Sequence, residues 1–293
     1  MRVADGWKDY ELLDTSDGQR LERWKDITLI RPDPQVIWST PKKHVGWRGA
    51  NATYLRSSSG GGHWEVRRRM PDVWQVAYGD LLFNIKPMGF KHTGLFPEQA
   101  VNWDWMRKAI EGAGRPIKVL NLFAYTGGAT LACAAAGASV CHVDASKGMV
   151  AWARENAAAS HLADRSIRWL VDDCIKFVAR EARRGNRYDA IIMDPPSYGR
   201  GPGGEVWKLP EQLHTLLTSC REILVEHPLF FVLNSYTTGL SPSVMGYMLS
   251  ALLGNTFGGE VHADEIGLPV TASGLVLPCG ATAVWSDKSC PSL

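Results

Sequence analysis

The sequence predicts a doubly wound α/β domain with a mostly parallel sheet, preceded by a smaller β-rich region. From Ile117 onward, short apolar runs alternate with amphipathic segments of ten or more residues, which is the pattern of consecutive βαβ units. Before that point, short β-prone runs are separated by turns. With 293 residues, 45% of them hydrophobic and 21% charged, the chain can bury a large core without disulfides or metal.

The N-terminal region is rich in tryptophan, proline and short β-prone runs. The clearest of these runs are Ile27–Pro32, Gln35–Thr40 and Trp74–Ile85. We expect them to form an antiparallel β-rich region rather than βαβ units. The candidate boundaries are the glycine run Ser57–Gly62 and the segment Lys86–Gly94. The sequence therefore predicts a substrate-recognition region over residues 1–90 and a second domain over residues 91–293.

The second domain alternates between predicted strands and predicted helices. The strands are expected at residues 118–125, 139–145, 166–173, 188–196 and 229–236, and the helices at 126–138, 147–162, 173–185 and 208–224. In residues 259–285, two β-prone runs surround the turn Thr271–Gly274, so we expect an antiparallel hairpin that closes the sheet. Right-handed crossovers then place a ligand crevice at the carboxyl ends of the parallel strands.

Composition limits the compartment and the metal chemistry. The net charge is +2, so any basic surface must be local. None of the six cysteines forms a CxxC pair and no His/Cys cluster has zinc spacing, so we expect reduced core thiols and no metal site. The N-terminus has no apolar signal-peptide core, and no apolar run approaches the ~20 residues of a membrane span. We expect a soluble, cytoplasmic protein without a membrane partner.

The segment Asn121–Thr130 joins a predicted strand to a predicted helix through a glycine turn. Gly127 and Gly128 let a ligand approach the backbone, and the helix N-terminus favours an anionic group. The GxGxxG fingerprint of nicotinamide dinucleotide sites is absent, which disfavours a nicotinamide oxidoreductase. A ligand with a carboxylate and no pyrophosphate fits this turn better. A plain strand–helix turn is the alternative interpretation.

Acidic residues end the next two strands. Asp144 can accept two hydrogen bonds from a ribose diol, and the alternative is that it caps the following helix. Asp172, Asp173 and Cys174 end the third strand and could contact an adenine edge. Asp173 could equally cap the helix that begins at Cys174. These positions predict the ribose and adenine contacts of a nucleoside-containing cofactor.

The turn after the fourth strand is the most specific signal in the chain. It reads Asp194-Pro195-Pro196-Ser197-Tyr198, and its two prolines remove backbone donors and fix φ. A stiff turn at the crevice can hold a planar substrate edge against a carboxylate and a carbonyl, with Tyr198 stacked on the plane. A simple rigid loop is the weaker alternative.

These segments resemble the class I S-adenosylmethionine-dependent methyltransferases. NLFAYTGGAT, the VDAS turn, NxAxSxL and DPPSY are most similar to the ribosomal-RNA large-subunit methyltransferase family, which includes cytosine-C5 and guanine-N7 enzymes. The resemblance covers Lys91–Trp285. It implies a Rossmann-like, mostly parallel seven-stranded sheet and S-adenosyl-L-methionine as the cofactor.

The resemblance also implies where the cofactor lies. Its methionine part would lie on Asn121–Gly128, its ribose on Asp144 and its adenine near Asp172–Cys174. The segment Lys91–Gln99 resembles the family's approach segment, which makes Gln99 a candidate contact. The full set of predicted cofactor contacts is Gln99, Asn121, Phe123, Ala124, Tyr125, Thr126, Gly127, Asp144, Ala145, Ser146, Asp172, Asp173 and Cys174. The predicted catalytic set is Asp194, Pro195, Pro196 and Tyr198, with Ser197 binding substrate.

One departure from the family bears on the chemistry. Cytosine-C5 transfer needs a cysteine thiolate that adds to C6 of the base, and in the cytosine-modifying relatives this cysteine follows the fifth strand. Here Leu233–Thr237 contains no thiol. Asn234 resembles the guanine-N7 branch instead, and a nitrogen target needs only positioning and electrostatics. We therefore expect a nitrogen target, with Asn234 as a substrate-binding residue.

The N-terminal region contains basic residues interleaved with tryptophans and nothing that resembles an RNA-binding PUA module. The basic residues are Lys42, Lys43, Arg48, Arg67, Arg68 and Arg69, and the tryptophans are Trp38, Trp47, Trp64 and Trp74. This combination suits single-stranded or looped RNA. The alternative is that Arg67–Arg69 alternate on a strand and are simply solvated.

The sequence thus predicts a methyltransferase that acts on a nucleobase, and ribosomal RNA is the expected substrate. Two alternatives stay open. One is a methyltransferase that acts on a small molecule or a protein side chain, with the N-terminal region as a substrate lid. The other is a non-catalytic RNA-binding assembly protein.

Overall fold

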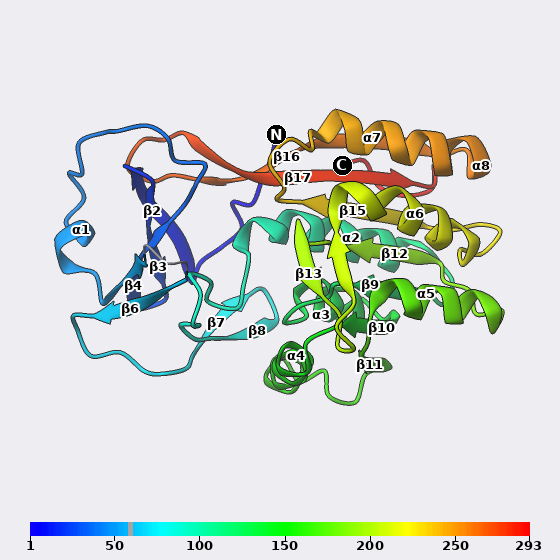
Figure 1. The fold of residues 1–293 in the computed structure, drawn as a ribbon, viewed down its shortest axis with the longest axis horizontal. Coiled ribbons are helices and arrows are strands. Elements are labelled where there is room, and N and C mark those ends of the chain that lie inside the picture. Colours follow the sequence, from blue (N-terminus) through cyan, green and yellow to red (C-terminus); the bar gives the residue numbers. More distant parts are fainter. Residues whose placement is uncertain (58–60) are drawn as a thin grey trace. The chain divides into compact units, whose positions relative to one another are not determined.

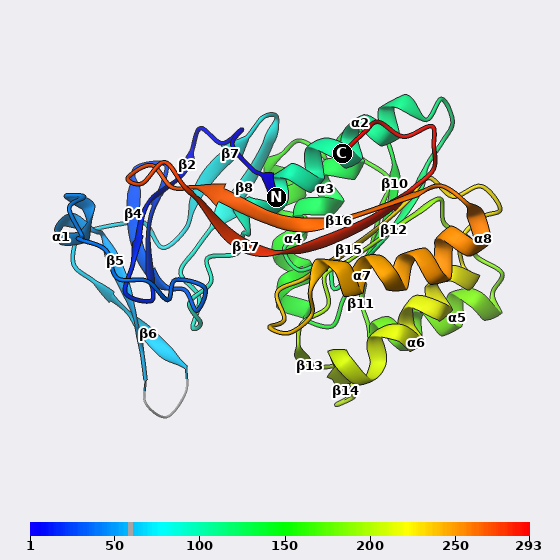
Figure 2. The same ribbon diagram turned by 90° about the horizontal axis from the view of Figure 1, so that it is seen from above.

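The structure is a computed structural model of the chain, and it describes residues 1–57 and 61–293. The candidate boundary at Ser57–Gly62 therefore lies partly outside the described residues. The chain forms two compact units. The first contains Met1–Ala100 and Ile266–Cys279, and the second contains Val101–Glu265 and Gly280–Leu293. Figures 1 and 2 follow the elements along the chain.

The first unit is built on a five-stranded sheet. Its order is β2 (Tyr10–Ser16), β3 (Gln19–Trp24), β4 (Ile27–Pro32), β5 (Ala52–Arg56), β6 (Gly62–Val66). The turn between β2 and β3 is Asp17–Gly18, with φ of 51° and 72°, which suits a tight hairpin. A second sheet pairs β7 (Trp74–Tyr78) with β8 (Leu81–Ile85), and the strand β1 (Arg2–Val3) pairs with the end of β16 (Glu260–Pro269).

Two expectations for this unit need correction. Strands β4 and β5 pair in parallel, because the chain between them is long and carries the short helix α1 (Gly46–Gly49). The remaining pairs of the five-stranded sheet are antiparallel, as expected. The segment Gln35–Thr40 is not a strand. Its carbonyl groups at Val36 and Trp38 accept hydrogen bonds from the Asp17–Gly18 turn instead of a strand neighbour.

The second unit contains the predicted doubly wound sheet. Neighbouring strands run in the order β17 (Val276–Ser286), β15 (Phe230–Ser235), β12 (Ala190–Met193), β9 (Lys118–Leu122), β10 (Ser139–Asp144), β11 (Ile167–Val171). Strand β17 is antiparallel to β15, whereas the other pairs in this series are parallel. Strands β16 and β17 form the predicted closing hairpin and contribute residues to both units. Together with β1, the sheet has eight strands.

Helices cover both faces of this sheet (Figure 2). One face carries α2 (Ala100–Gly112), α3 (Gly128–Ala135) and α4 (Lys147–Ala159), and the other carries α5 (Cys174–Arg183), α6 (Leu209–Glu222) and α7 (Pro242–Leu249). The helical segment after α7 continues as η2 (Ser250–Gly254) and α8 (Asn255–Phe257). Among the described residues, no helix has the length and the apolar character that crossing a membrane would take.

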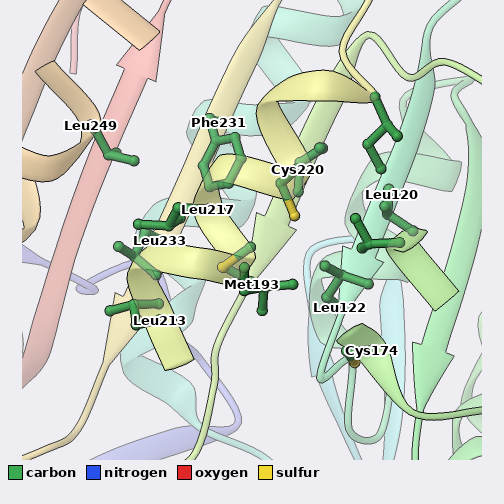
Figure 3. Packing of buried hydrophobic residues seen from close by; sticks show 14 of the residues in the cluster. Leu120, Leu122, Cys174, Met193, Leu213, Leu217, Cys220, Phe231, Leu233 and Leu249 are labelled. Carbon is green, nitrogen blue, oxygen red and sulfur yellow. The ribbon is translucent and has the colours of Figure 1, made fainter. Parts of the chain in front are cut away.

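The core of the second unit explains why α6 lies on the sheet. Leu213, Leu217 and Cys220 follow helical spacing, so they share one face of α6. In Figure 3 that face points at sheet residues that include Met193 and Leu233. All of these side chains are buried, and each buried leucine contributes about 1.5–3 kcal/mol to folding. This packing fixes the strand ends that form the candidate site.

Candidate active site

The carboxyl ends of five parallel strands meet at one edge of the second unit's sheet. The register pairs Leu122 with Val143 on one side and with Met193 on the other. Asp144 pairs with Val171 and Met193 pairs with Leu233. The residues that follow these strands therefore lie along the same edge, with the reversal of strand order between β9 and β12. This reversal is where open α/β sheets bind ligands.

The loop after β9 is held in an unusual backbone conformation. Phe123, Tyr125 and Gly127 all have left-handed φ values, of 53°, 51° and 89°. Such values cost about 1–3 kcal/mol at a non-glycine residue and persist only where the surroundings fix them. Two hydrogen bonds do so here, from the Ala124 N–H to the Val143 carbonyl (3.1 Å) and from the Tyr125 N–H to the Asp144 carboxylate (2.9 Å). These hydrogen bonds hold the loop in its left-handed conformation.

Asp144 is half-buried at the end of β10. Its Oδ2 accepts the Tyr125 N–H at 2.9 Å and its Oδ1 accepts the Ser146 N–H at 2.8 Å. Burial raises the pKa of Asp144 above its usual value, and these two backbone hydrogen bonds act in the opposite direction. Ser146, not Asp144, caps α4, because its hydroxyl accepts the Met149 N–H. Each carboxylate oxygen keeps a lone pair for a ligand.

Asn121, at the start of the loop segment, has a buried side chain. Its Nδ2 donates to the Thr130 hydroxyl at 2.9 Å, and that hydroxyl lies 2.9 Å from Nδ1 of His142. Burial lowers the pKa of His142 to about 3, so the imidazole is neutral. The network ties β9 to α3 and β10. Asn121 therefore supports the loop from inside, and any cofactor contact would come from its backbone.

The third strand end presents two carboxylates that already have partners. Asp173 caps α5, because its Oδ1 accepts the Lys176 N–H at 2.9 Å. Asp172 forms an ion pair with Arg180 and accepts the Asp173 N–H at 2.9 Å. The Cys174 thiol is buried in the core. Of the two interpretations open for Asp173, the capping role is present in the structure.

Hydrogen bonds from two other segments hold the turn Asp194–Tyr198 in place. The Trp207 indole N–H donates to the Pro196 carbonyl at 2.6 Å, and the Ser197 hydroxyl lies 2.7 Å from the Thr237 hydroxyl. The ring of Trp207 lies 5.1 Å from that of Phe123 in the β9 loop. Pro195 is buried, whereas Pro196 and Ser197 are exposed and Asp194 is half-buried. Trp207 therefore couples the two loops of the candidate site.

Tyr198 begins a small hairpin that the sequence did not indicate. Strand β13 (Tyr198–Arg200) pairs with β14 (Val206–Lys208), and the Tyr198 side chain is 53% exposed. Trp207 is the middle residue of β14, and its role was missed because three-residue strands leave no periodicity. The only signal available was a tryptophan shortly before an amphipathic helix.

Asn234 lies near the end of β15 with its side chain buried. Its Oδ1 accepts hydrogen bonds from Asn102 Nδ2 at 3.1 Å and from the Thr282 hydroxyl at 2.7 Å. These bonds link β15 to α2 and β17. The side chain thus has an internal structural role, and its predicted contact with substrate stays a prediction.

The described cysteines do not offer a reactive thiol. Cys133, Cys141, Cys174, Cys220 and Cys279 are buried, and Cys290 is partly buried. Burial raises the pKa of Cys174 and of Cys220, and it raises that of Cys141 to about 11. A thiol with a raised pKa is protonated at neutral pH and is a poor nucleophile. No group of three or more metal-ligating side chains occurs in the described residues.

In the first unit, most of the predicted RNA-binding tryptophans prove to be structural. Trp47 and Trp74 are buried, and Trp64 donates its indole N–H to the Met88 carbonyl at 2.8 Å. Trp38 is 37% exposed and bonds to Thr15. The interleaving of tryptophans with cations thus reflects packing at these positions.

The cations Arg67–Arg69 are exposed and follow β6, so they do not alternate on a strand. Arg67 pairs with Glu65 at 3.0 Å. Two aromatic residues that the sequence did not single out, Tyr54 and Phe90, line a cavity of ≈ 590 Å³ together with Arg56 and Lys91. Each of them lies within two positions of a cation in the sequence, a signal that could have marked them.

Gln99 belongs to the first unit, where it ends the 3-10 turn η1 (Pro97–Gln99) and is buried. The residues at the edge of the sheet belong to the second unit. The predicted contact between Gln99 and the cofactor stays a prediction.

Three comparisons connect this geometry with known proteins. A family model described as S-adenosylmethionine-dependent methyltransferase matches residues 56–239. A SAM-dependent methyltransferase from Agrobacterium tumefaciens has a similar structure, with 38% identity, a TM-score of 0.93, and coverage of 98% of this chain and 93% of that one. A putative SAM-dependent methyltransferase from Streptococcus mutans, 18% identical with a TM-score of 0.73 over 96% of this chain and 76% of that one, shares the fold.

One relative found by sequence similarity has a name that states its substrate. The ribosomal RNA large subunit methyltransferase K/L of Shewanella sp. (strain ANA-3) is 34% identical over 183 residues, which is 60% of this chain. The match spans only 23% of the relative's own length.

Proposed function

Because the chain belongs to the S-adenosylmethionine-dependent methyltransferase family, we propose that it methylates a nucleobase nitrogen in RNA, with ribosomal RNA as the first candidate. The cofactor is S-adenosyl-L-methionine, which supplies an activated methyl group on a sulfonium centre. The observation that carries the proposal is the rigid Asp194–Tyr198 turn, fastened by Trp207 next to the β9 loop. The similarity to proteins named ribosomal RNA large subunit methyltransferase supports the substrate class.

The residues at the sheet edge fit this cofactor. The loop with left-handed φ values at Phe123, Tyr125 and Gly127 would bind the methionine part through its backbone, and the start of α3 would favour its carboxylate. The Asp144 carboxylate, held by two backbone N–H groups, would accept the ribose hydroxyls. Ala145 and Ser146 continue that surface. The backbone near Asp172–Cys174 would contact the adenine, since both carboxylates there have other partners.

The substrate would lie against the Asp194–Tyr198 turn. Asp194 would accept a hydrogen bond from an amino or imino group of the base, the exposed Pro196 ring would limit the tilt of the base, and buried Pro195 would keep the turn stiff. Exposed Tyr198 would stack on the base, and Ser197 would border it. A nitrogen lone pair can attack the methyl carbon directly, so positioning supplies most of the catalysis. A base in a duplex would have to be extruded from its stack.

A nitrogen target also agrees with the thiols of this chain. Cytosine-C5 transfer needs a thiolate at the substrate, whereas β15 ends in Asn234–Ser235 and burial raises the pKa of Cys174 and of Cys220. This argument favours N7 or an exocyclic amine over C5.

The proposal can be tested with tritiated S-adenosylmethionine and undermethylated large-subunit ribosomal RNA. We expect label in the RNA, a loss of at least about a hundredfold in rate for Asp194→Ala, and cofactor affinity within several-fold of wild type. Asp164→Ala, at an exposed aspartate on another loop, is the matched control. Equal loss of transfer and cofactor binding would refute the role of Asp194. Label only in a protein or metabolite extract would refute the RNA substrate.

A further inference from the structure

The first unit contains a strongly basic pocket. Its volume is ≈ 420 Å³, and it is lined by residues 41–45, Arg48, Gly49 and Arg68. Four of the lining side chains are cationic, Lys42, Lys43, Arg48 and Arg68, and none is a carboxylate. Since like charges repel, a cluster of this kind is stable only where an anion or bulk water compensates it.

The cations of this pocket differ from the other arginines of the unit in their partners. Arg23 and Arg31 pair with Glu11 and Glu22, at 3.1 and 2.5 Å. Three of the pocket's cations are exposed: Lys43, Arg48 and Arg68. Their side chains form no ion pair or hydrogen bond within the described part of the chain. These three charges are available to a ligand.

The fourth cation of the lining is Lys42, and neighbouring side chains hold it in position. Lys42 bonds to Gln19 at 2.9 Å, pairs with Asp17 at 3.4 Å and lies 4.5 Å from the centre of the Trp47 ring. Trp47 is buried and donates its indole N–H to the Asp14 carboxylate at 2.8 Å. The helix α1, which carries Trp47, is therefore anchored to β2.

The lining of the pocket also includes a residue from the segment that follows β6. Arg68 follows β6, and its guanidinium lies beside α1, where Nη2 is 3.4 Å from the position that a Cβ on Gly49 would occupy. The absence of a side chain at Gly49 thus leaves room for the arginine. Arg48 and Arg68 come from segments far apart in sequence, yet the fold brings both to one cavity.

We propose that this pocket binds phosphate groups of the RNA backbone, with Lys43, Arg48 and Arg68 as the contacting residues. The inference rests on the proposed RNA substrate and deepens it. Guanidinium groups bind phosphate oxygens in a bidentate way, and lysine adds a mobile point charge. The apolar side chains in the lining are few, and the tryptophan beneath is buried, so the pocket suits phosphates better than bases.

The test compares two triple variants of the full-length protein that lose the same charge. The pocket variant is Lys43→Ala/Arg48→Ala/Arg68→Ala, and the control is Lys8→Ala/Lys108→Ala/Arg183→Ala, at exposed cations elsewhere. The measurements are the Kd for undermethylated large-subunit ribosomal RNA at several salt concentrations, the Kd for S-adenosylmethionine, and methyl transfer.

For the pocket variant we expect RNA affinity to fall at least about tenfold and the slope of log K against log salt to decrease by about 2. Cofactor affinity should stay unchanged, and the control should keep most of its RNA affinity and slope. If wild type binds and methylates RNA but both variants behave alike, the pocket assignment is wrong and the proposed function stands. If wild type neither binds nor methylates RNA, the proposed function fails and the pocket assignment fails with it.

Discussion

At the scale of single residues, Asp144 is the residue to which the proposed function assigns the cofactor's ribose. Replacing it with asparagine should raise the Kd for S-adenosylmethionine by about tenfold to a hundredfold, because hydrogen bonds to a charged acceptor contribute about 1.5–3 kcal/mol. Isothermal titration calorimetry measures this, with Asp164→Asn as the matched control at an exposed position. Unchanged affinity in Asp144→Asn would place the ribose elsewhere.

The pKa of Asp144 adds a pH dependence to that interaction. Burial raises its pKa, and only the ionised carboxylate accepts hydrogen bonds at both oxygens. Cofactor affinity should therefore fall as the pH drops toward this raised pKa, earlier than an ordinary aspartate would require. The Asp144→Asn variant should lack this acid limb. An identical acid limb in both proteins would assign the titration to another group.

Glu22 shows what a buried carboxylate does to stability. Burial raises its pKa, but Arg20 and Arg31, with hydrogen bonds from Arg31 and Tyr10, lower it from 4.5 to about 2. A lowered folded-state pKa stabilises the protein above the unfolded pKa, by about 3 kcal/mol here, and this contribution is lost as the pH falls from 4.5 to 2.

Urea unfolding at pH 6 and pH 3 measures this loss. Glu22→Gln should be less stable at pH 6, because it leaves two buried arginines short of a partner, and its stability should change less between the two pH values. Glu65→Gln removes an exposed carboxylate of the same unit and should behave as wild type at both. A pH response in Glu22→Gln equal to that of wild type would contradict the assignment.

At the scale of elements, the hairpin of β13 and β14 holds the Asp194–Tyr198 turn in position through the hydrogen bond from Trp207 to Pro196. Trp207→Phe keeps an aromatic ring against Phe123 but removes the hydrogen bond to the Pro196 carbonyl. The turn should then lose its fixed position, so kcat should fall about tenfold or more while cofactor affinity is retained. Steady-state kinetics with calorimetry separates the two quantities. Loss of cofactor affinity as well would mean that the ring supports the β9 loop instead.

The elements that could be predicted from sequence are those with their own periodicity. Strands β9 to β12 and helices α4 to α6 repeat at the spacing of buried strands and amphipathic helices, so their order and the closing hairpin were predicted correctly. Strand β3 was missed because its buried side chains include Arg20 and Glu22, which break the apolar pattern. Gln35–Thr40 has a β-prone composition, yet Ile37 is 91% exposed and the backbone bonds to a turn.

The same reasoning explains which parts of the candidate site could be predicted. Residues that end a strand or directly follow one, such as Asp144 and Asp194, could be identified because the ends of parallel strands converge. Partners that depend on distant segments could not. Trp207 on Pro196 joins residues 11 apart through a hairpin, and Asn102 bonds Asn234 132 positions away. Contacts between residues so far apart leave no pattern in the local sequence.

At the scale of the whole molecule, the first unit is assembled from two distant parts of the chain. Residues 1–100 form most of it, and Ile266–Cys279 completes it. The backbone N–H groups of Thr271 and Ala272 donate to the carbonyls of Leu12 and Leu13, at 3.0 and 2.9 Å, and the Thr271 hydroxyl donates to Glu11 at 2.7 Å.

This arrangement imposes an order on biosynthesis. Strand β2 is translated before the residues that bond to Leu12 and Leu13, which follow some 260 positions later. At about 5–20 residues per second, the N-terminal sheet waits for many seconds with part of its backbone unsatisfied. The second unit's parallel strands emerge in the meantime. A nascent chain arrested before β16 would therefore hold a first unit that lacks Ile266–Cys279 and a second unit that lacks most of β17.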